Sequence, residues 1–338
     1  LIESYLENRS LRVKIGQNVS TWARLNKGVP QGSVVGPHCF NVYLNDLLVE
    51  LCQNSIIPSN YADDNTCTVI GSTRNETIDL VKKTVSQLAV WFKDNMMKAN
   101  LDKFQFLFLC PNKKANEDSV TISIENITLT SQDEAKLLGF YIDKALVFDK
   151  HVKQKCKLAN AKLQALKRLS KFLTKDCKLA VLRSYVVSQF SYCSPLMHFS
   201  SKYSRQKMEK IHFRGLCITF NDYNSSYEEL LHRSKSCTVE LLREKAIVTE
   251  MYKCLNGLGP AYYNDIFTVQ TRSSRRGPTF KLPRARTTKY GLNSLRFAGP
   301  KLWNELENEL KLALTLDNFK SKLVNHKGTM CKCAQCRI

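Results

Sequence analysis

Two adjacent carboxylates, Asp63 and Asp64, lie between two short runs of strand-forming residues. Ile56, Ile57 and Tyr61 precede the pair, and the β-formers that follow it are Thr66, Thr68, Val69 and Ile70. This pattern predicts a β-hairpin with both carboxylates near its tip. Mg²⁺ prefers oxygen ligands and is usually held by one or two carboxylates plus substrate phosphates, as in two-metal phosphoryl transfer. The alternative is that the pair only forms a turn, in which Asp is common.

A segment rich in glycine and proline, Gly28–Pro37, precedes the carboxylate pair. Its glycines allow the backbone to approach a ligand closely, and Pro37 is suited to the first turn of a helix. Apolar residues then recur at helical spacing, at Phe40, Leu44, Leu47, Leu48 and Leu51. We therefore expect a helix with one buried face, whose N-terminus favours a phosphate. The alternative is that the glycines and prolines only mark turns.

Four segments of the chain resemble, in order and spacing, successive palm motifs of the reverse transcriptases of non-LTR retrotransposons. They are Gly28–Pro37, Tyr61–Asp64, Trp91–Asn95 with Asn100–Lys103, and Leu137–Asp143. The likeness is to the jockey and chicken-repeat types of element, whose sequence after the polymerase is similar to Lys289–Arg296 and Gly299–Asn304 here. The resemblance covers most of the chain and is strongest from Gly28 to about Asp149.

This resemblance implies an RNA-directed DNA polymerase that binds an RNA template, a DNA primer and deoxynucleotides. Asp63 would be a Mg²⁺ ligand and Asp64 would support the catalytic site. Lys103 would be a basic catalytic residue near the leaving pyrophosphate. The residues implied to line the nucleotide and templating base are Gln31, Gly32 and Tyr61. The residues implied to grip the primer end are Leu138 and Gly139.

Polymerases of this family need a further Asp, on a strand well upstream of the Gly28 motif. The carboxylates that precede Asp63 fall in helical patterns instead: Glu3, Glu7, Asp46 and Glu50. We therefore expect the C-terminal part of a longer polymerase, with weak or absent Mg²⁺ binding and no activity by itself, because positioning and charge stabilisation are both lost. The competing interpretation is a non-catalytic RNA- or DNA-binding protein derived from such an element.

Positive charge is concentrated in the second part of the chain. Residues 1–150 hold 16 basic and 17 acidic residues, whereas residues 151–338 hold 35 basic and 13 acidic residues, a net charge of +22. Such a surface favours the phosphates of nucleic acid. Within it, 151–173 has the apolar periodicity of an amphipathic helix. The lysines on its polar face that we expect to follow a duplex, as a polymerase thumb does, are Lys153, Lys157, Lys167 and Lys171.

Two alternatives and one further basic segment complete this region. The lysine face is equally typical of an ordinary solvated helix. Five aromatic residues nearby are suited to stacking on bases but are expected mostly in the core: Tyr185, Tyr192, Phe199, Tyr203 and Phe213. Residues 271–290 read as an extended basic linker that clamps RNA, with Arg275 and Arg276 among its cations.

The chain has 13 cysteines and no apolar run approaching a membrane span. We therefore expect no membrane partner, and reduced thiols in an intracellular protein of the nucleus or cytoplasm. Four soft ligands are grouped near the C-terminus: His326, Cys331, Cys333 and Cys336. They form a candidate tetrahedral Zn²⁺ site, although Cys-x-Cys is not a usual zinc-finger spacing. The alternative is a metal-free tail.

The expected fold class is α+β, with four parts. Residues 1–150 form a partial reverse-transcriptase palm of antiparallel sheet with helices, and residues 151–270 form a helical, thumb-like region. Residues 271–290 are the linker, and residues 291–338 form a C-terminal module. Within the first part we expect a helix over 73–95 that starts with a Thr73 and Glu76 capping box, a strand over 104–108 and a hairpin over 120–129.

Overall fold

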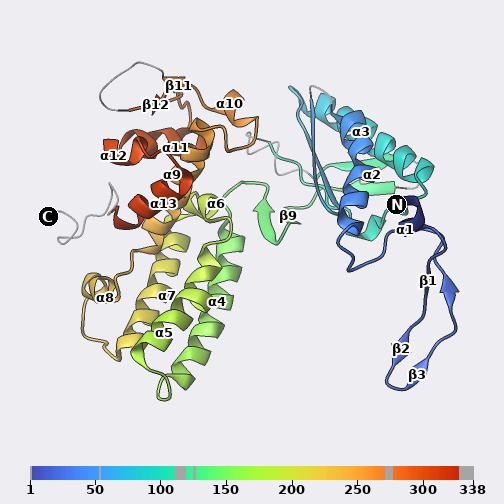
Figure 1. Cartoon of the computed structure of the whole chain (residues 1–338). Helices are drawn as coiled ribbons and strands as arrows, with labels where there is room; N and C mark the ends of the chain where they lie inside the picture. The colour runs from blue at the N-terminus through green and yellow to red at the C-terminus, as the bar shows by residue number, and fades with distance from the viewer. Residues whose placement is uncertain (1, 53–54, 111–118, 125–126, 271–276, 327–338) are drawn as a thin grey trace. The chain divides into compact units, whose positions relative to one another are not determined.

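The structure, a computed structural model, describes residues 2–52, 55–110, 119–124, 127–270 and 277–326. The described chain divides into two compact units (Figure 1). The first takes in the residues up to Phe106 together with Ser119–Ser131, and the second takes in 107–110 and the residues from Gln132 onward. Both contain helices and small antiparallel sheets, and every sheet in the described ranges has two strands. No helix among these residues is long and apolar enough to cross a membrane.

The first unit is built from helices and four two-stranded sheets. Its helices are α1 (Ile2–Leu6), α2 (Gly36–Leu51), α3 (Arg74–Asp94) and the 3₁₀ turn η1 (Leu101–Lys103). Its strand pairs are β1 (Ser10–Leu11) with β4 (Ala23–Arg24), β2 (Lys14–Ile15) with β3 (Asn18–Val19), β5 (Ile56–Tyr61) with β6 (Asp64–Val69), and β7 (Thr121–Ile124) with β8 (Ile127–Thr130).

A small apolar core joins α2, α3 and the β5–β6 hairpin. The helix predicted after Pro37 is confirmed as α2, and it buries Leu44, Leu47 and Leu51 against Trp91 of α3. Cys67 of β6 packs against the same cluster. The core therefore holds one face of the hairpin against two helices.

The start of α3 follows the predicted capping box. The Thr73 hydroxyl accepts a hydrogen bond from the Glu76 N–H at 3.2 Å, and the Glu76 carboxylate accepts one from the Thr73 N–H at 3.3 Å. These two bonds satisfy donors that the first helical turn leaves unpaired.

One strand prediction in this region is confirmed and one is wrong. The hairpin over 120–129 is present as β7–β8, with Ile122 opposite Leu129. Residues 104–108 form no strand in the structure. Alternating apolar residues are not enough to make a strand, because each strand also needs a neighbour that completes its backbone hydrogen bonds.

The second unit is mostly helical. Its strands are β9 (Glu134–Leu137) paired with β10 (Phe140–Asp143), and β11 (Val269–Gln270) paired with β12 (Thr279–Phe280). Its α-helices are α4 (Asp149–Leu169), α5 (Lys175–Val181), α6 (Ser194–His198), α7 (Lys202–Phe220), α8 (Tyr227–Ser234), α9 (Val239–Leu255), α10 (Tyr263–Ile266), α11 (Leu295–Asn304), α12 (Asn308–Lys311) and α13 (Leu316–Asn325). Its other helical segments are the π-helix η3 (Leu182–Val186), the 3₁₀-helix η4 (Val187–Phe190) and the π-helix η5 (Thr288–Leu292).

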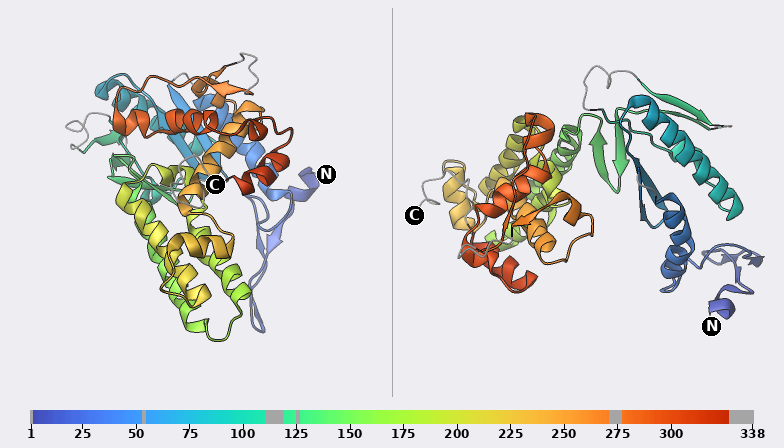
Figure 2. Two further views of the ribbon diagram at one scale, coloured as in Figure 1. Left: turned by 90° about the vertical axis from the view of Figure 1, so that its left-hand side faces the viewer. Right: turned by 90° about the horizontal axis from the view of Figure 1, so that it is seen from above.

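The larger core of this unit lies along α4, which packs against α7 and η3 (Figures 1 and 2). The predicted amphipathic helix is confirmed, because its apolar side is buried at Val152, Cys156, Ala159, Leu163 and Leu166. Phe140 of β10 belongs to the same core, so the β9–β10 hairpin is part of the second unit.

A second core joins α9 to α11, α12, α13 and β12. Phe280, from the segment expected to be an extended linker, is 1% exposed in this core. The neighbouring backbone is held as well, because the Trp303 indole N–H donates to the Pro278 carbonyl at 3.0 Å. The described residues at this end of the expected linker are therefore packed against α11.

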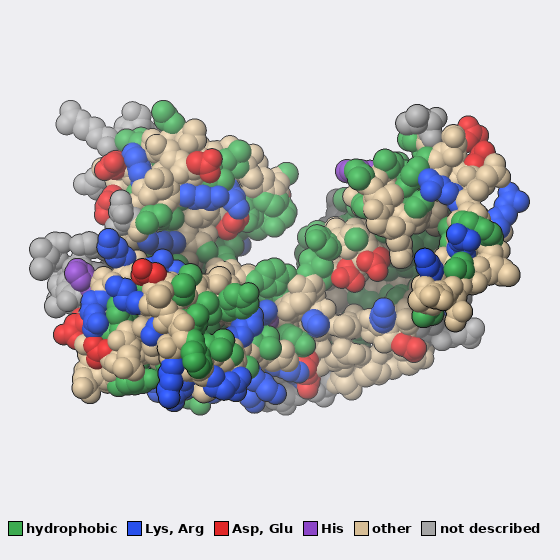
Figure 3. Space-filling model, turned by 60° about the horizontal axis from the view of Figure 1, so that its bottom comes forward, with side chains coloured by type: hydrophobic (Ala, Val, Ile, Leu, Met, Phe, Trp, Pro, Cys, Tyr) green, Lys and Arg blue, Asp and Glu red, His purple; other side chains and the backbone are tan. Residues whose placement is uncertain are grey.

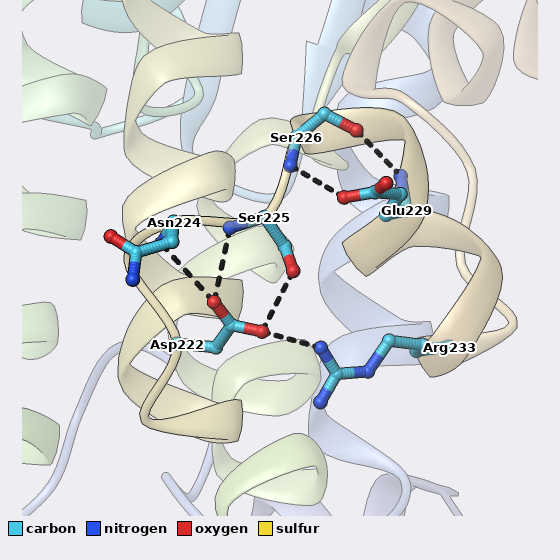
Figure 4. A network of polar contacts seen from close by, with 6 residues as sticks. All are labelled: Asp222, Asn224, Ser225, Ser226, Glu229 and Arg233. Atoms are coloured by element: carbon cyan, nitrogen blue, oxygen red, sulfur yellow. Dashed lines mark hydrogen bonds and ion pairs between the residues drawn. The ribbon is translucent and has the colours of Figure 1, made fainter.

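The loop between α7 and α8 closes on a polar network (Figure 4). The Asp222 carboxylate accepts hydrogen bonds from the Asn224 N–H at 3.1 Å and the Ser225 N–H at 3.0 Å, and forms an ion pair with Arg233 at 2.6 Å. The pKa of Asp222 is lowered, first by the hydrogen bonds from Ser225 and then by Arg233. A capping box of Ser226 and Glu229 starts α8 beside it.

Candidate functional site: a carboxylate hairpin and a basic helical unit

The predicted carboxylate hairpin is present as β5–β6. Tyr61 lies opposite Asp64, so that Ala62 and Asp63 form a two-residue turn. Ala62 has a positive φ of 53°, as the first position of a tight hairpin turn requires in types I′ and II′. The local sequence therefore places one carboxylate in the turn and the other at the first position of the returning strand.

The two faces of this hairpin differ in exposure. Cys67 and Asn65 lie on the face that is turned toward the core, where Asn65 is opposite Asn60. Tyr61 and Asp64 lie on the other face and are exposed, with Tyr61 68% exposed. Asp63 in the turn is exposed as well. Both carboxylates are therefore open to a ligand while the opposite face of the hairpin is anchored.

The Asn pair below the tip carries an unsatisfied donor and acceptor. The Asn60 Nδ2 atom and the Asn65 Oδ1 atom are buried, and neither has a hydrogen-bond partner among the described residues. Asn65 Nδ2 reaches the Asp63 carbonyl at 3.5 Å. Asn60 and Asn65 are register partners across the two strands.

The donor set of this tip is incomplete for a metal ion. Asp63 and Asp64 supply two carboxylates of the type that Mg²⁺ prefers. Within the described ranges, however, no group of three or more His, Cys, Asp or Glu side chains is placed to hold a metal ion. The described residues by themselves therefore do not fit a two-metal site.

The glycine-rich loop is folded under the start of α2. The Ser33 hydroxyl donates to the Pro30 carbonyl at 2.8 Å and accepts from the Gly36 N–H at 3.1 Å. A side chain at Gly36 would lie 2.7 Å from that hydroxyl, so the close turn requires glycine there. Gln31 and Gly32 are exposed at the tip of this loop, and Gly32 has φ 83°.

Lys103, the other residue implied to be catalytic, is exposed in η1. In the described part of the chain no hydrogen bond or ion pair joins it to Asp63 or Asp64. The structure therefore puts Lys103 in the same unit as the carboxylates without bringing it into contact with them.

The β9–β10 turn holds Leu138 and Gly139, the residues implied to grip a primer end. Both have positive φ, 47° and 81°, which is the type I′ geometry of a two-residue hairpin. The Tyr192 hydroxyl donates a hydrogen bond to the Leu138 carbonyl at 2.5 Å. This bond attaches the turn to the segment that follows η4.

His151 of α4 contacts the β10 strand of the same hairpin. Its ring stacks on Phe140 with the centroids 3.9 Å apart, and its Nδ1 accepts from the Tyr141 N–H at 3.3 Å. Burial, followed by the charge of Lys155, lowers the pKa of His151 to about 4. The imidazole is thus neutral at pH 7, which its role as an acceptor requires.

The lysines predicted to follow a nucleic-acid backbone lie on the solvent side of the second unit. All four of these lysines are exposed: Lys153, Lys157, Lys167 and Lys171. Figure 3 shows Lys and Arg side chains in several groups on the left-hand part of the view, which belongs to this unit. A surface of this kind attracts phosphates by charge, without reading sequence.

The expectation that the aromatic residues of this region are mostly in the core is wrong for three of the five. Phe199 and Phe213 pack against the core. The exposed fractions of Tyr185, Tyr192 and Tyr203 are 59%, 46% and 66%. The spacing of these tyrosines in the sequence does not distinguish a buried helix face from an exposed one.

Parts of the predicted site lie outside the described residues: Arg275, Arg276, Cys331, Cys333 and Cys336. His326, the fourth candidate zinc ligand, is described at the end of α13. Its side chain is 8% exposed, with Nδ1 3.7 Å from a Glu307 carboxylate oxygen. The pKa of His326 is lowered, chiefly by burial.

Comparison with known proteins agrees with these features. Residues 1–142 match the family described as reverse transcriptase (RNA-dependent DNA polymerase). A probable RNA-directed DNA polymerase from transposon BS of Drosophila melanogaster is 26% identical over 229 residues, which cover 64% of this chain and 25% of the relative. The probable RNA-directed DNA polymerase from transposon X-element of the same species is 28% identical over 155 residues, covering 45% and 17%. The RNA-directed DNA polymerase from mobile element jockey of Drosophila funebris is 26% identical over 160 residues, covering 45% and 17%.

The chain spans a quarter or less of the length of these three relatives. No solved structure matches it. The family match includes the glycine-rich loop, the carboxylate hairpin and the β9–β10 turn. Residues 1–142 therefore match the reverse transcriptase family, and the chain is similar to the RNA-directed DNA polymerases of non-LTR retrotransposons such as jockey.

Proposed function

We propose that the chain is part of an RNA-directed DNA polymerase of a non-LTR retrotransposon, in which the β5–β6 hairpin presents Asp63 as a ligand of the catalytic metal. The observation that carries this proposal is the hairpin tip, where both carboxylates are exposed within the segment that matches the family. Asp64, at the first position of β6, supports the site from the exposed face of the hairpin. At least one further carboxylate, from outside the described residues, must complete the metal site.

The other expected contacts follow from the same proposal. Gln31 and Gly32, with Tyr61 beside the carboxylates, contact the templating base and the incoming deoxynucleotide. Leu138 and Gly139 contact the primer end. Support comes from the exposure of Gln31 and Gly32 on a turn that is held at its base, and from the anchored β9–β10 turn.

The second unit binds the template and primer in this proposal. The net charge of +22 after residue 150 and the exposed lysines of α4 support it. The same observation favours the second candidate, a nucleic-acid-binding protein without polymerase activity. The two candidates differ only in what Asp63 does, so the next two experiments address that residue.

The metal-ligand role is tested by cleavage with Fe²⁺ and ascorbate, in which iron replaces Mg²⁺ and cuts the backbone beside its site. In the chimera described in the next paragraph, whose remaining part supplies the further carboxylate, we expect cuts near residues 61–66 that excess Mg²⁺ suppresses and that Asp63→Asn removes. Asp79→Asn is the matched control, because Asp79 is an exposed carboxylate of α3 that pairs only with Lys82 in the described contacts, at 3.8 Å. Equal cutting of the Asp63→Asn and Asp79→Asn chains would contradict the role.

Polymerase function is tested in a chimera. The segment of the jockey polymerase of Drosophila melanogaster that aligns with residues 1–142 is replaced by those residues. We expect extension of oligo(dT) on poly(rA) in Mg²⁺ by the chimera and by its Asp79→Asn variant, and loss of extension in Asp63→Asn. Extension that survives Asp63→Asn would favour the non-catalytic candidate.

The proposed zinc site at the C-terminus is tested separately. We expect the purified chain to retain one zinc ion, measured by atomic absorption. The single variants His326→Ala and Cys333→Ala are each expected to lose it. Zinc content that is unchanged in both variants would exclude this ligand set.

A further inference from the structure

Two tyrosine–lysine pairs lie along the region where α4 packs against η3 and η4. The Lys155 ammonium lies 5.5 Å from the centroid of the Tyr192 ring, and the Lys162 ammonium lies 5.9 Å from the centroid of the Tyr185 ring. Both distances fall within the range of a cation–π contact. We call these four residues the tyrosine–lysine stripe.

The two tyrosines of the stripe do not belong to the buried core. The core beneath it is filled from the same segment by Leu182, Val186 and Phe190, which are at most 2% exposed. Tyr185 and Tyr192 point outward from that core, with 59% and 46% of their surfaces exposed. In the described chain neither Lys155 nor Lys162 forms an ion pair with a carboxylate. Two aromatic rings and two uncompensated cations are therefore presented to a ligand.

The backbone that carries the tyrosines is irregular. Tyr185 lies in the π-helix η3, and the chain then continues as the 3₁₀-helix η4. Cys193, which follows Tyr192, has φ 53°. Single π-helical turns are rare and occur frequently at functional sites, because they interrupt the ordinary hydrogen-bond ladder. This irregularity is an observation independent of the charge and exposure of the side chains.

The two pairs are held at a defined separation. Lys155 and Lys162 are seven residues apart on one helix, which corresponds to about 10.5 Å at 1.5 Å per residue. That distance equals about three steps of a stacked strand at about 3.4 Å per nucleotide. Tyr192 is also fixed through its hydroxyl, which donates to the Leu138 carbonyl at 2.5 Å.

We infer that the tyrosine–lysine stripe binds single-stranded nucleic acid by stacking unpaired bases on Tyr185 and Tyr192, while Lys155 and Lys162 contact the phosphates. The inference rests on the proposed nucleic-acid role of the second unit, and it adds that this surface takes a single strand. A duplex cannot use the rings in this way, because its base faces are already stacked inside the helix. Positive charge alone would serve a duplex and a single strand alike.

The test measures binding of the full chain to a fluorescent 12-nucleotide oligo(dT) and to a fluorescent 12-base-pair duplex, by anisotropy. We expect the double variant Tyr185→Leu with Tyr192→Leu to bind the single strand at least about fivefold more weakly, since stacking of one base on an aromatic ring is worth that much or more. Its affinity for the duplex is expected to stay unchanged.

Two further variants separate stacking from other effects. Tyr185→Phe with Tyr192→Phe keeps both rings and removes both hydroxyls, including the one bonded to Leu138, so we expect it to lose clearly less single-strand affinity than the leucine variant. Tyr223→Leu changes an equally exposed tyrosine, 62% exposed in the loop after α7, and is expected to change nothing. Circular dichroism verifies that each variant keeps its helix content.

Three outcomes overturn the inference. They are unchanged single-strand binding in the leucine variant, an equal loss on single strand and duplex, and a loss in the phenylalanine variant as large as in the leucine variant. If the wild-type chain binds the duplex while one of these outcomes is found, the proposed nucleic-acid role of the second unit stands and only the stripe is refuted. If the wild-type chain binds neither probe, that role fails as well.

Discussion

Glu209 of α7 caps the N-terminus of α9, which begins thirty residues later in the sequence. Its carboxylate accepts hydrogen bonds from the Val239 N–H at 3.1 Å and the Glu240 N–H at 2.6 Å, the first two residues of α9. It also accepts the Tyr227 hydroxyl at 2.7 Å. A negative charge at a helix N-terminus satisfies unpaired donors and interacts favourably with the helix dipole.

The loss of stability on removing Glu209 depends on whether each of its hydrogen-bond donors keeps another acceptor. The Tyr227 hydroxyl keeps a partner, because His212 Nδ1 lies 2.8 Å from it. The two N–H groups of α9 lose their acceptor, at about 1 kcal/mol each for a lost cap, and the dipole contribution adds about 0.5 kcal/mol. Glu209→Ala should therefore destabilise the start of α9 by about 2–3 kcal/mol, and Glu209→Gln by about 1 kcal/mol because one acceptor oxygen remains.

Hydrogen exchange with mass spectrometry measures this effect locally. Peptides covering residues 239–255 should exchange about 30- to 150-fold faster in Glu209→Ala, since each 1.4 kcal/mol corresponds to a factor of ten. Glu228→Ala is the control, because Glu228 is an exposed acid in the first turn of α8. Exchange in α9 that matches the wild type in Glu209→Ala would refute the capping argument.

Three other predictions concern single features of the second unit. Gly139→Ala should destabilise the β9–β10 turn by about 1 kcal/mol through backbone strain alone. The reason is that φ at Gly139 is 81° and the added carbon would meet no atom within 4 Å. Unchanged hydrogen exchange in the β9–β10 peptides would contradict this prediction. His151 and His212 have pKa values lowered to about 4 by burial, so their contribution to stability is present above the unfolded pKa of about 6.5 and is lost as the pH falls toward 4. The urea midpoint should therefore be lower at pH 5 than at pH 7, and His212→Gln should make that dependence shallower. Gly215→Ala should lower the urea midpoint, because the new carbon would lie 2.3 Å from Leu182 Cδ1 in the core. The expected cost of overpacking, about 1–3 kcal/mol, exceeds the gain in helix propensity of about 1 kcal/mol. A raised midpoint would show that the core relaxes around the added carbon.

Much of the local structure could be predicted from the sequence because its signals are local. The strand-forming residues on either side of Asp63 predict the β5–β6 hairpin, and Thr73 with Glu76 predicts the start of α3. The periodicity after Pro37 predicts α2, and that after His151 predicts the buried face of α4. Each of these depends on residues that are close together in the chain, so no knowledge of the tertiary structure was needed.

The strand expected over 104–108 was wrong for the opposite reason. Alternation of Phe104, Phe106 and Phe108 satisfies the pattern of a strand, but a strand is stable only beside another one. The exposure of Tyr185 and Tyr192 was missed in the same way, since their spacing fits a buried helix face as well as an exposed one. Burial is decided by which neighbours arrive, and they come from α4 and α7.

The sequence by itself determined the match of residues 1–142 to the reverse transcriptase family, the carboxylate hairpin and the basic character of the chain after residue 150, because motifs and charge are properties of the residues in order. Only the tertiary structure decided that both carboxylates are exposed, that Glu209 caps α9, and that two tyrosines of an irregular helical segment lie against two lysines of α4. The cap and the two tyrosine–lysine contacts join residues about 20 to 40 positions apart, and their geometry is set by the packing of helices around a shared core, which no local pattern specifies.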